Sequence, residues 1–182
     1  MADQPLSEPI IRYGRSGDAP ELSRLAALTF RAAYEADLAG PALDRYIADH
    51  YSPAQQAAEL ADDRLTYLVV EQAGAMIGFA LLRTDEHHPA ITGERPVMLS
   101  QIYLDPAHTG GGIGSTLMRR CLAEASARGH DTVWLGVWER NRRAIALYER
   151  WGFRAVGEMV FDFAGHAQRD MVMQRDVDHA ED

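Results

Sequence analysis

Residues 108–115 read HTGGGIGS and contain four glycines within eight positions. The run follows the apolar stretch VMLSQIYL (97–104) and precedes LMRRCLAEASARG (117–129), which has helical periodicity. A helix N-terminus presents unpaired N–H groups and a partial positive charge, and glycines before it let an anion approach the backbone without meeting Cβ atoms. The junction therefore predicts either a tight turn or a loop that binds a phosphate group.

Two familiar phosphate-binding motifs do not account for this glycine run. A Walker loop requires Gly-Lys-Ser/Thr, whereas Gly114-Ser115-Thr116 has no lysine. The dinucleotide fingerprint opens the first βα unit of its domain, but here the glycines lie late in the chain. A phosphate-binding loop of another kind remains.

A second group of polar residues lies in NRRAIALYERWGF (141–153). Asn141, Ala144 and Tyr148 are spaced i, i+3 and i+7, which places them on one face of a helix. A tyrosine at this spacing is either a core residue with its hydroxyl at the edge or a group that donates a proton in catalysis. On the helix alone, the interpretation as a core residue is favoured.

The elements that must position these residues follow from apolar periodicity and turn residues. An Asp18 N-cap, Pro20 in the first turn and Glu21 predict a helix start, and Gly129 predicts a helix stop. Gln72-Ala73-Gly74 predicts a hairpin turn. The predicted strands are 9–14, 65–71, 75–83, 97–104, 132–138, 153–163 and 169–177, and the predicted helices are 18–38, 42–51, 54–63, 112–128 and 141–151. We expect one mixed α/β (α+β) domain over residues 9–177, with loose tails at 1–8 and 178–182.

Composition restricts the partners of the chain. It has 182 residues, with 18 lysines and arginines against 27 aspartates and glutamates, and its formal net charge is −9. This acidic balance disfavours nucleic acid. No run of about 18 apolar residues is present, and MADQPLSEP lacks the basic and apolar regions of a secretory signal. We expect a cytoplasmic protein with no nucleic-acid or membrane partner.

Residue types that often carry redox or metal chemistry are sparse. Cys121 is the single cysteine, which excludes an internal disulfide, and it lies on the apolar stripe of helix 112–128. We expect a buried, unreactive thiol. His87 and His88 are adjacent in a polar loop and lack the spacing of metal ligands. We expect a solvated pair and no metal site.

Together the two motifs resemble those of the GNAT family of N-acetyltransferases. The family pattern Gln/Arg-x-x-Gly-x-Gly/Ala falls on Thr109-Gly110-Gly111-Gly112-Ile113-Gly114, and Asn-x-x-Ala-x-x-x-Tyr-x-x-x-Gly-Phe falls on residues 141–153. The order of elements matches from the first strand to the last, so the resemblance covers nearly the whole chain. It implies a central mixed sheet of about seven strands flanked by helices on both faces. Thr109 departs from the pattern, because the family usually has Arg or Gln there.

The resemblance also implies acetyl-CoA as co-substrate, without a metal. Backbone groups of Ile102, Tyr103 and Leu104 would hold the pantetheine arm and the thioester carbonyl. Asn141 would bond the pantetheine arm beside Ala144, and Tyr148 would act as general acid at the sulfur. The N–H groups that would surround the pyrophosphate belong to Gly110, Gly111, Gly112, Ile113, Gly114 and Ser115. Gly136 would suit a close approach of cofactor and backbone.

Within the family, the sequence is most similar to the PaiA type of spermidine/spermine N-acetyltransferases. The similarity is carried by residues 133–153, by TFRAAYEADL (29–38) and by RYIADHYSPAQQAAEL (45–60). It implies a polyamine acceptor, which suits the acidic composition. Carboxylates that could line a polyamine groove are Glu35, Asp37, Asp85 and Glu86. Taken individually, each of them is better explained as solvated surface charge.

The general base is the second departure from the resemblance. These enzymes often carry a glutamate on the fourth strand, where this chain has Ser100 followed by Gln101. Freeing an alkyl amine of pKa about 10.4 at pH 7 requires about 4.6 kcal/mol, against about 1 kcal/mol for an α-amino group. One hypothesis is that Ser100, with Gln101, orders a water that carries the proton away.

Without a strong base, weakly basic acceptors become easier to acetylate. N-terminal protein acetylation and detoxification of small amines therefore stand as alternatives to polyamines. A non-catalytic acyl-CoA-binding sensor is a further alternative, against which the proton donor Tyr148 argues. The oligomeric state is open, and a homodimer is one option.

Overall fold

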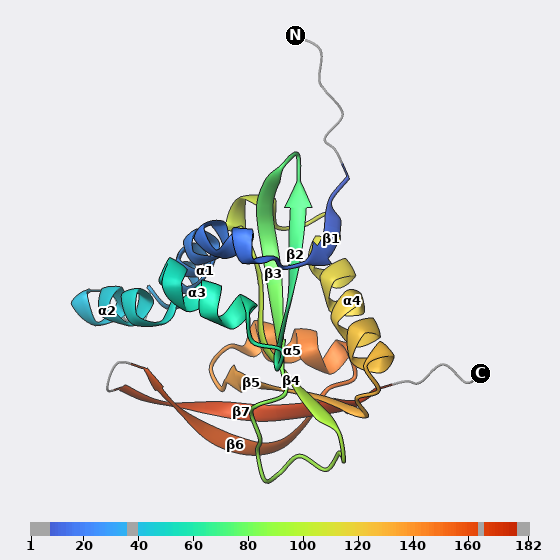
Figure 1. Ribbon diagram of the computed structural model, residues 1–182. Coiled ribbons are helices and arrows are strands. Elements are labelled where there is room, and N and C mark those ends of the chain that lie inside the picture. The colour runs from blue at the N-terminus through green and yellow to red at the C-terminus, as the bar shows by residue number, and fades with distance from the viewer. Residues whose placement is uncertain (1–7, 36–39, 164–165, 178–182) are drawn as a thin grey trace. The chain divides into compact units, whose positions relative to one another are not determined.

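In the computed structural model, which describes residues 8–35, 40–163 and 166–177, seven strands form a mixed sheet in the order β1-β2-β3-β4-β5-β7-β6 (Figure 1). The strands are β1 Ile10–Tyr13, β2 Leu65–Gln72, β3 Ala75–Arg83, β4 Pro96–Leu104, β5 Thr132–Trp138, β6 Arg154–Phe163 and β7 His166–Asp176. The helices are α1 Ala19–Tyr34, α2 Pro41–His50, α3 Pro53–Leu60, α4 Ile113–Ala127 and α5 Arg142–Arg150, with short 3-10 turns η1 Ser16–Asp18 and η2 Pro106–His108. The predicted fold class is confirmed.

Most element boundaries agree with the sequence prediction to within one residue. The larger differences are that β7 begins at His166 rather than at 169, α3 ends at Leu60 rather than at 63, and α1 ends at Tyr34 rather than at 38. The two 3-10 turns were not predicted. The predicted end of the first helix at 38 and most of both predicted tails lie outside the described residues.

The chain packs into two compact units. The first unit comprises residues 1–81 and 101–120, and the second comprises residues 82–100 and 121–182. The strand β4 and the helix α4 each contribute one part to each unit. The single domain predicted for residues 9–177 stays a prediction.

In the first unit, α1 packs through one apolar face. Leu22, Leu25, Ala26 and Phe30 recur at helical spacing, and each is at most 3% exposed. The strand β1 pairs with β2 in antiparallel fashion, with Ile10 opposite Glu71. These contacts position α1 and β1 within the first unit.

The start of α1 corrects one prediction. Asp18 is at the N-cap position, but its side chain makes no capping hydrogen bond to the helix. Its carboxylate instead accepts bonds from the guanidinium of Arg12 at 2.7 and 2.9 Å and from the backbone N–H of Arg15 at 2.7 Å. These bonds hold the pKa of Asp18 below its usual range, with Arg12 as the main cause.

In the second unit, β7 pairs with β5 on one side and with β6 on the other, both in antiparallel fashion. The parallel register of β4 with β5 covers three pairs among the described residues and ends at Met98 opposite Trp134, although both strands continue. Cys121 is fully buried, as predicted. Gly129 ends α4 with a positive φ of 73°, and His130 N–H donates to the Ala125 carbonyl.

The two faces of the sheet in the second unit carry different elements. The side chain of Gln174 bonds both the N–H and the hydroxyl of Thr92, in the loop 84–95. Its neighbour Arg175 donates 2.7 Å to the carbonyl of Trp151, at the end of α5. Because successive strand residues point to opposite faces, the loop and α5 lie on opposite sides of β7. We call these sides the loop face and the helix face.

Candidate active site

The glycine run adopts a conformation that other residues rarely take. Gly110, Gly111 and Gly112 have φ values of 100°, 58° and 79°, in the region that L side chains disfavour. A Cβ atom added at any of the three would meet nothing within 4 Å. Close packing therefore does not explain the glycines, and the conformation of the loop does.

This loop presents backbone donors at the start of α4. Ile113 N–H donates to the Gly110 carbonyl, and Thr116 N–H donates to the Gly112 carbonyl. In the described part of the chain, the N–H groups of Gly111, Gly112, Gly114 and Ser115 meet no acceptor. An exposed loop with several donors before a helix N-terminus suits a pyrophosphate.

Side chains next to the loop fix its ends. The Thr116 hydroxyl donates to the Gly112 carbonyl at 3.2 Å and accepts from the Arg119 guanidinium at 3.0 Å. This contact holds the exposed guanidinium of Arg119 on the second turn of α4. Thr109, the departure from the family motif, donates its hydroxyl to the Pro106 carbonyl at 3.1 Å. Its side chain therefore stabilises η2.

The end of β4 offers its backbone rather than its side chains. Tyr103 packs against Phe79, with ring centroids 5.8 Å apart. A Cβ at Gly78 would lie 2.4 Å from Leu104 Cδ2 and 3.0 Å from the Tyr103 carbonyl, so β3 runs tightly against this segment. Ile102, Tyr103 and Leu104 are all half-buried. Their side chains are packed, which leaves main-chain groups for a ligand.

Ser100 and Gln101 do not share a water site, which corrects the sequence hypothesis. They are consecutive in β4, so their side chains point to opposite faces. Gln101 donates from Nε2 to the Tyr51 hydroxyl at 3.3 Å, and its buried Oε1 has no partner among the described residues. Ser100 shares its face with Met98. Only Ser100 remains as a candidate for holding a water.

An aromatic cluster lies beside Gln101 and was not predicted from the sequence. The ring of Phe30 lies 4.5 Å from Tyr34, 5.0 Å from Tyr46 and 5.2 Å from Tyr51. Burial raises the pKa of Tyr51 well above 10 and that of Tyr46 to about 12. Both hydroxyls are therefore neutral at pH 7, and neither serves as a base. The spacing of Phe30 and Tyr34, one helical turn apart, was the available signal.

The helix α5 places Asn141 and Tyr148 as expected, with one added role. Asn141 is the N-cap, and its Oδ1 accepts from the Ala144 N–H at 3.1 Å. Its amide nitrogen remains the donor available to a ligand. Tyr148 is half-buried, and its ring meets Phe153 edge-on at 5.7 Å. Both residues belong to the second unit.

Two of the acidic candidates for a polyamine groove, Asp85 and Glu86, pair with a neighbouring cation. The guanidinium of Arg83 pairs with Asp85 at 2.7 Å and with Glu86 at 3.7 Å. Glu35 is exposed at the C-cap of α1, and Asp37 lies outside the described residues. The interpretation as ordinary surface charge describes Asp85 and Glu86 better than a cation-binding groove.

The two histidines of the loop 84–95 behave differently from a solvated pair. His88 accepts from the Ala90 N–H at Nδ1 and lies 3.2 Å from the Glu158 carbonyl at Nε2. These contacts require the Nε2–H tautomer, so the ring ties the loop to β6. His87 is exposed, as predicted. Within the described ranges, no group of three or more His, Cys, Asp or Glu residues could hold a metal ion.

A second feature missed by the sequence is a buried carboxylate on β7. Asp170 is 9% exposed and accepts a bond of 2.7 Å from the Gln168 amide. Burial raises its pKa above the usual value of 3.8. The only signal in RDMVMQRD was an aspartate that shares the strand alternation of Val172 and Gln174.

A family model now accounts for both motifs: the acetyltransferase (GNAT) family model matches residues 29–153. The chain belongs to this family. It is 34% identical to an uncharacterized N-acetyltransferase of Mycobacterium tuberculosis, over 88% of this chain and 98% of that protein. It is 30% identical to the streptothricin acetyltransferase of Streptomyces lavendulae, over 80% of this chain and 82% of that protein.

Solved structures of this acetyltransferase family share the fold. The PaiA N-acetyltransferase of Thermoplasma acidophilum, in complex with coenzyme A, aligns with a TM-score of 0.75 and 20% identity, covering 93% of this chain and 99% of that one. The spermidine N-acetyltransferase of Vibrio cholerae, in complex with CoA and spermine, gives 0.66 and 23%, covering 93% and 95%. At these identities the likeness shows the fold alone.

These findings establish an N-acetyltransferase of the GNAT family. The glycine loop and α5 both lie in the part of the chain that the family model matches, or at its edge. In the described part of the chain, no helix is long and apolar enough to cross a membrane.

Proposed function

We propose that the protein transfers the acetyl group of acetyl-CoA to a primary amine of a small molecule. The observation that carries the cofactor assignment is the glycine loop, with three consecutive positive φ values and four N–H groups that meet no acceptor in the described chain. A pyrophosphate bound there would accept these donors and face the N-terminus of α4. The exposed Arg119 adds positive charge one turn further on.

The remaining cofactor contacts follow the family pattern. Backbone groups of Ile102, Tyr103 and Leu104 bind the pantetheine arm and the thioester carbonyl, and Asn141 adds a bond from its amide nitrogen. When bound, acetyl-CoA supplies an activated acyl carbon and a thiolate leaving group. Tyr148 donates the proton that the departing sulfur requires, and Ser100 holds a water beside the acceptor.

The acceptor is the less defined half of the reaction. Polyamines such as spermidine are the acceptors implied by the PaiA-like segments, and the net charge of −9 suits a cation. The pairing of Asp85 and Glu86 with Arg83 weakens this assignment, because a polyamine needs several unpaired carboxylates. The 30% identity to a streptothricin acetyltransferase supports a second candidate, an amine of an antibiotic-like molecule.

A panel of amines tests the proposal. The purified protein is mixed with acetyl-CoA and with polyamines, amino-terminal peptides or antibiotic-like amines, and released thiol is measured. We expect release with at least one small amine, with product mass increased by one acetyl group. Calorimetric titration with CoA runs in parallel. Tight CoA binding without thiol release from any amine would instead indicate an acyl-CoA-binding sensor.

A further inference from the structure

An amine that attacks a thioester must lose a proton, and the residues considered so far offer no group that can keep it. A serine hydroxyl relays a proton but does not retain it. Tyr46 and Tyr51 have raised pKa values, so their hydroxyls are already protonated at pH 7. The reaction therefore leaves open where the proton goes.

The carboxylate of Asp170 occupies a defined place on the loop face. It lies opposite Trp138 of β5 and opposite Met159 of β6, and it shares its face with Val172. A Cβ added at Gly136 would be 3.6 Å from Asp170 Oδ2 and 3.0 Å from Met159 Sδ. The carboxylate and the thioether thus cover the backbone of Gly136. Close packing of these two side chains is therefore a second explanation for the glycine, and the expected approach of a cofactor stays a prediction.

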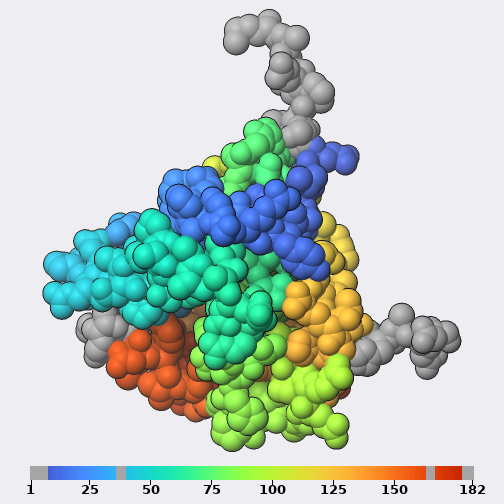
Figure 2. Space-filling view, viewed as in Figure 1, coloured from blue at the N-terminus to red at the C-terminus, as the bar shows by residue number. Residues whose placement is uncertain are grey.

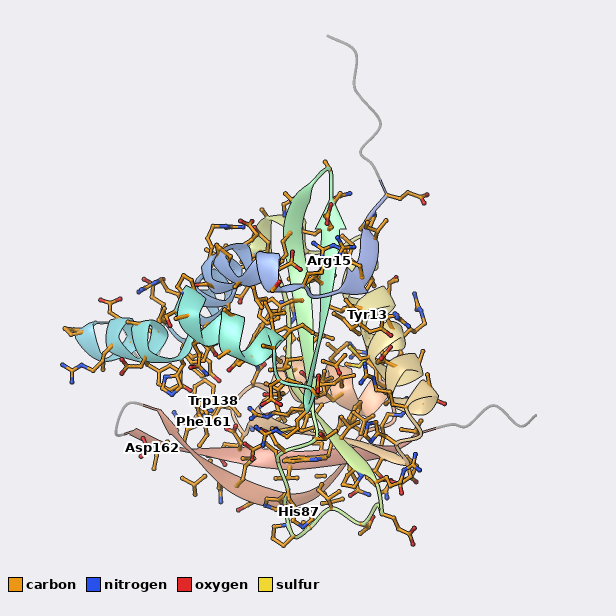
Figure 3. All side chains as sticks on the ribbon, viewed as in Figure 1. Tyr13, Arg15, His87, Trp138, Phe161 and Asp162 are labelled. Atoms are coloured by element: carbon orange, nitrogen blue, oxygen red, sulfur yellow. The ribbon has the colours of Figure 1, made fainter. Side chains whose placement is uncertain are left out.

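The surroundings of this carboxylate are largely apolar. Trp138 stands on the β5 side, and Phe161 of β6 lies opposite Gln168, the neighbour of Asp170 on the same face. Figure 3 labels Trp138 and Phe161 near the β6–β7 hairpin. The Gln168 amide donates to Oδ1, and Oδ2 accepts no bond from the described residues.

No cation neutralises Asp170 among the residues that the structure describes. The nearest cation in sequence, Arg169, points to the helix face, where it bonds Glu139 at 2.7 Å and Glu158 at 3.5 Å. On the loop face, the other titratable groups are His88, whose two ring nitrogens are engaged by Ala90 and Glu158, and the ion pair of Arg154 with Asp176 at the far end of β7. The elements packed against Asp170 otherwise present Trp138, Gly136, Met159, Gln168 and Val172.

An unpaired carboxylate that is only 9% exposed is unfavourable for folding. Such groups are found preferentially at functional sites, where a base needs a pKa nearer to neutrality. Burial shifts the pKa of Asp170 in that direction. The buried position of Asp170 and the direction of its pKa shift therefore both support a chemical role for this residue.

We propose that Asp170 is the general base of the acetyl transfer and takes the proton from the attacking amine. This rests on the proposed function. The amine nitrogen forms a bond to the acetyl carbon, and the C–S bond breaks. The proton lost by nitrogen moves to the carboxylate, and the thiolate receives a proton from Tyr148. Proton release from Asp170 and reprotonation of Tyr148 by solvent complete the cycle.

The position of Ser100 fits this assignment. It lies two residues beyond Met98, whose partner in β5 is Trp134, and it therefore points to the loop face as Asp170 does. Its hydroxyl can hold a water on the face that carries Asp170. Asp170 supplies what Ser100 lacks, a group that retains the proton.

The acid and the base lie on opposite sides of β7. The helix α5, which carries Tyr148, ends against Arg175 on the helix face, whereas Asp170 lies on the loop face. In the tetrahedral intermediate the nitrogen and the sulfur are separate substituents of the acyl carbon. The base and the acid therefore act on different atoms and need not be adjacent.

Kinetics of Asp170→Asn test the proposal, because asparagine keeps the size and can still accept from Gln168. We expect kcat/KM near neutral pH to fall by about 10²-fold or more, since positioned proton transfer typically contributes 10²–10⁴-fold. CoA affinity should stay unchanged. Asp176→Asn, an exposed aspartate on the same strand, is the matched control and should retain full activity.

The pH profile of the wild type tests the proposal without any variant. For two acceptors of different pKa, kcat/KM of the wild type should begin to rise at the same pH. In Asp170→Asn, the pH at which kcat/KM rises should instead shift with the pKa of the acceptor. A limb that follows the acceptor in the wild type, or an unaltered rate in Asp170→Asn, would overturn the role of Asp170. If the wild type binds no CoA, or releases no thiol with any amine, the proposed function itself is refuted.

Discussion

The glycine loop before α4 and the Asp170 carboxylate of β7 are proposed to serve the reaction in different ways. The loop is exposed and uses backbone N–H groups, so its chemistry depends on the φ angles of Gly110, Gly111 and Gly112. Asp170 is buried, and its chemistry depends on which side chains the neighbouring strands place around it. A site built from backbone groups can be detected in the sequence by its glycines. A site that depends on the register of neighbouring strands has almost no sequence signal.

Removing the proposed proton donor on α5 should have the largest effect. Tyr148→Phe keeps the ring and its edge-on contact with Phe153 but removes the hydroxyl. We expect kcat to fall by about 10²–10⁴-fold, with little change in CoA affinity. Steady-state kinetics and calorimetry measure the two quantities. If chemistry limits the rate and kcat is unaltered, Tyr148 is a packing residue.

Changing the loop should affect binding rather than chemistry. Gly112→Val forces a branched side chain to φ 79°, which is unfavourable by roughly 1–2 kcal/mol or more for an L residue. We expect CoA affinity to fall at least about tenfold. Gly74→Val is the matched control, because Gly74 has φ 80° and open space around it but lies in the β2–β3 turn.

The control separates general strain from a local binding effect. Both variants should lower the melting temperature by similar amounts, but only Gly112→Val should weaken CoA binding. Equal CoA affinity in the wild type and Gly112→Val would refute the loop as the pyrophosphate site.

The buried carboxylate makes the opposite prediction, a variant that is more stable than the wild type. Because burial raises the pKa of Asp170 in the folded state, the ionised form opposes folding above the unfolded value of about 3.9. Asp170→Asn should therefore have a higher free energy of unfolding than the wild type at pH 7. The gain should shrink as the pH falls toward 4. Urea denaturation at the two pH values measures it.

A stability gain combined with lost activity would mark Asp170 as a functional group held at the expense of folding. If Asp170→Asn is less stable than the wild type at pH 7, the carboxylate has a stabilising partner, and the contrast with the loop disappears.

The smallest effect is expected at the start of α5, where one side chain has two tasks. Asn141→Asp keeps the oxygen that accepts from Ala144 N–H and removes the amide donor. We expect unchanged thermal stability and a several-fold loss of CoA affinity, since one hydrogen bond contributes about 1 kcal/mol. Asn141→Ala should lose both affinity and about 1 kcal/mol of stability. Equal CoA affinity in Asn141→Asp and the wild type would assign the residue to capping alone.

Local signals in the sequence predicted most of the fold. All seven strands follow from apolar alternation, and Gly129 ends α4 as its position indicated. The glycine loop and the spacing of Asn141 and Tyr148 are also local patterns. The assignment of the chain to its family, which the comparisons confirm, followed from these two patterns.

What could not be predicted depends on residues that are distant in the chain. Asp18 was expected to cap α1, but Arg12 reaches its carboxylate first. Asp170 gains its environment from strands whose register sets Trp138 and Met159 opposite it, and a one-residue slip would turn it to the helix face. Periodicity identifies a strand but does not state which neighbours flank each side chain.

The unpacked glycines also have a thermodynamic consequence. Glycine loses more conformational freedom on ordering than any other residue, and nothing within 4 Å would meet a side chain at Gly110, Gly111 or Gly112. A ligand that bonds their N–H groups must fix all three at once. Cofactor association at this loop should therefore carry an unfavourable entropy change, offset by the enthalpy of charge-assisted hydrogen bonds. Because this entropy change is unfavourable, it weakens the affinity for the cofactor on warming. The loop should therefore release CoA more readily at higher temperature.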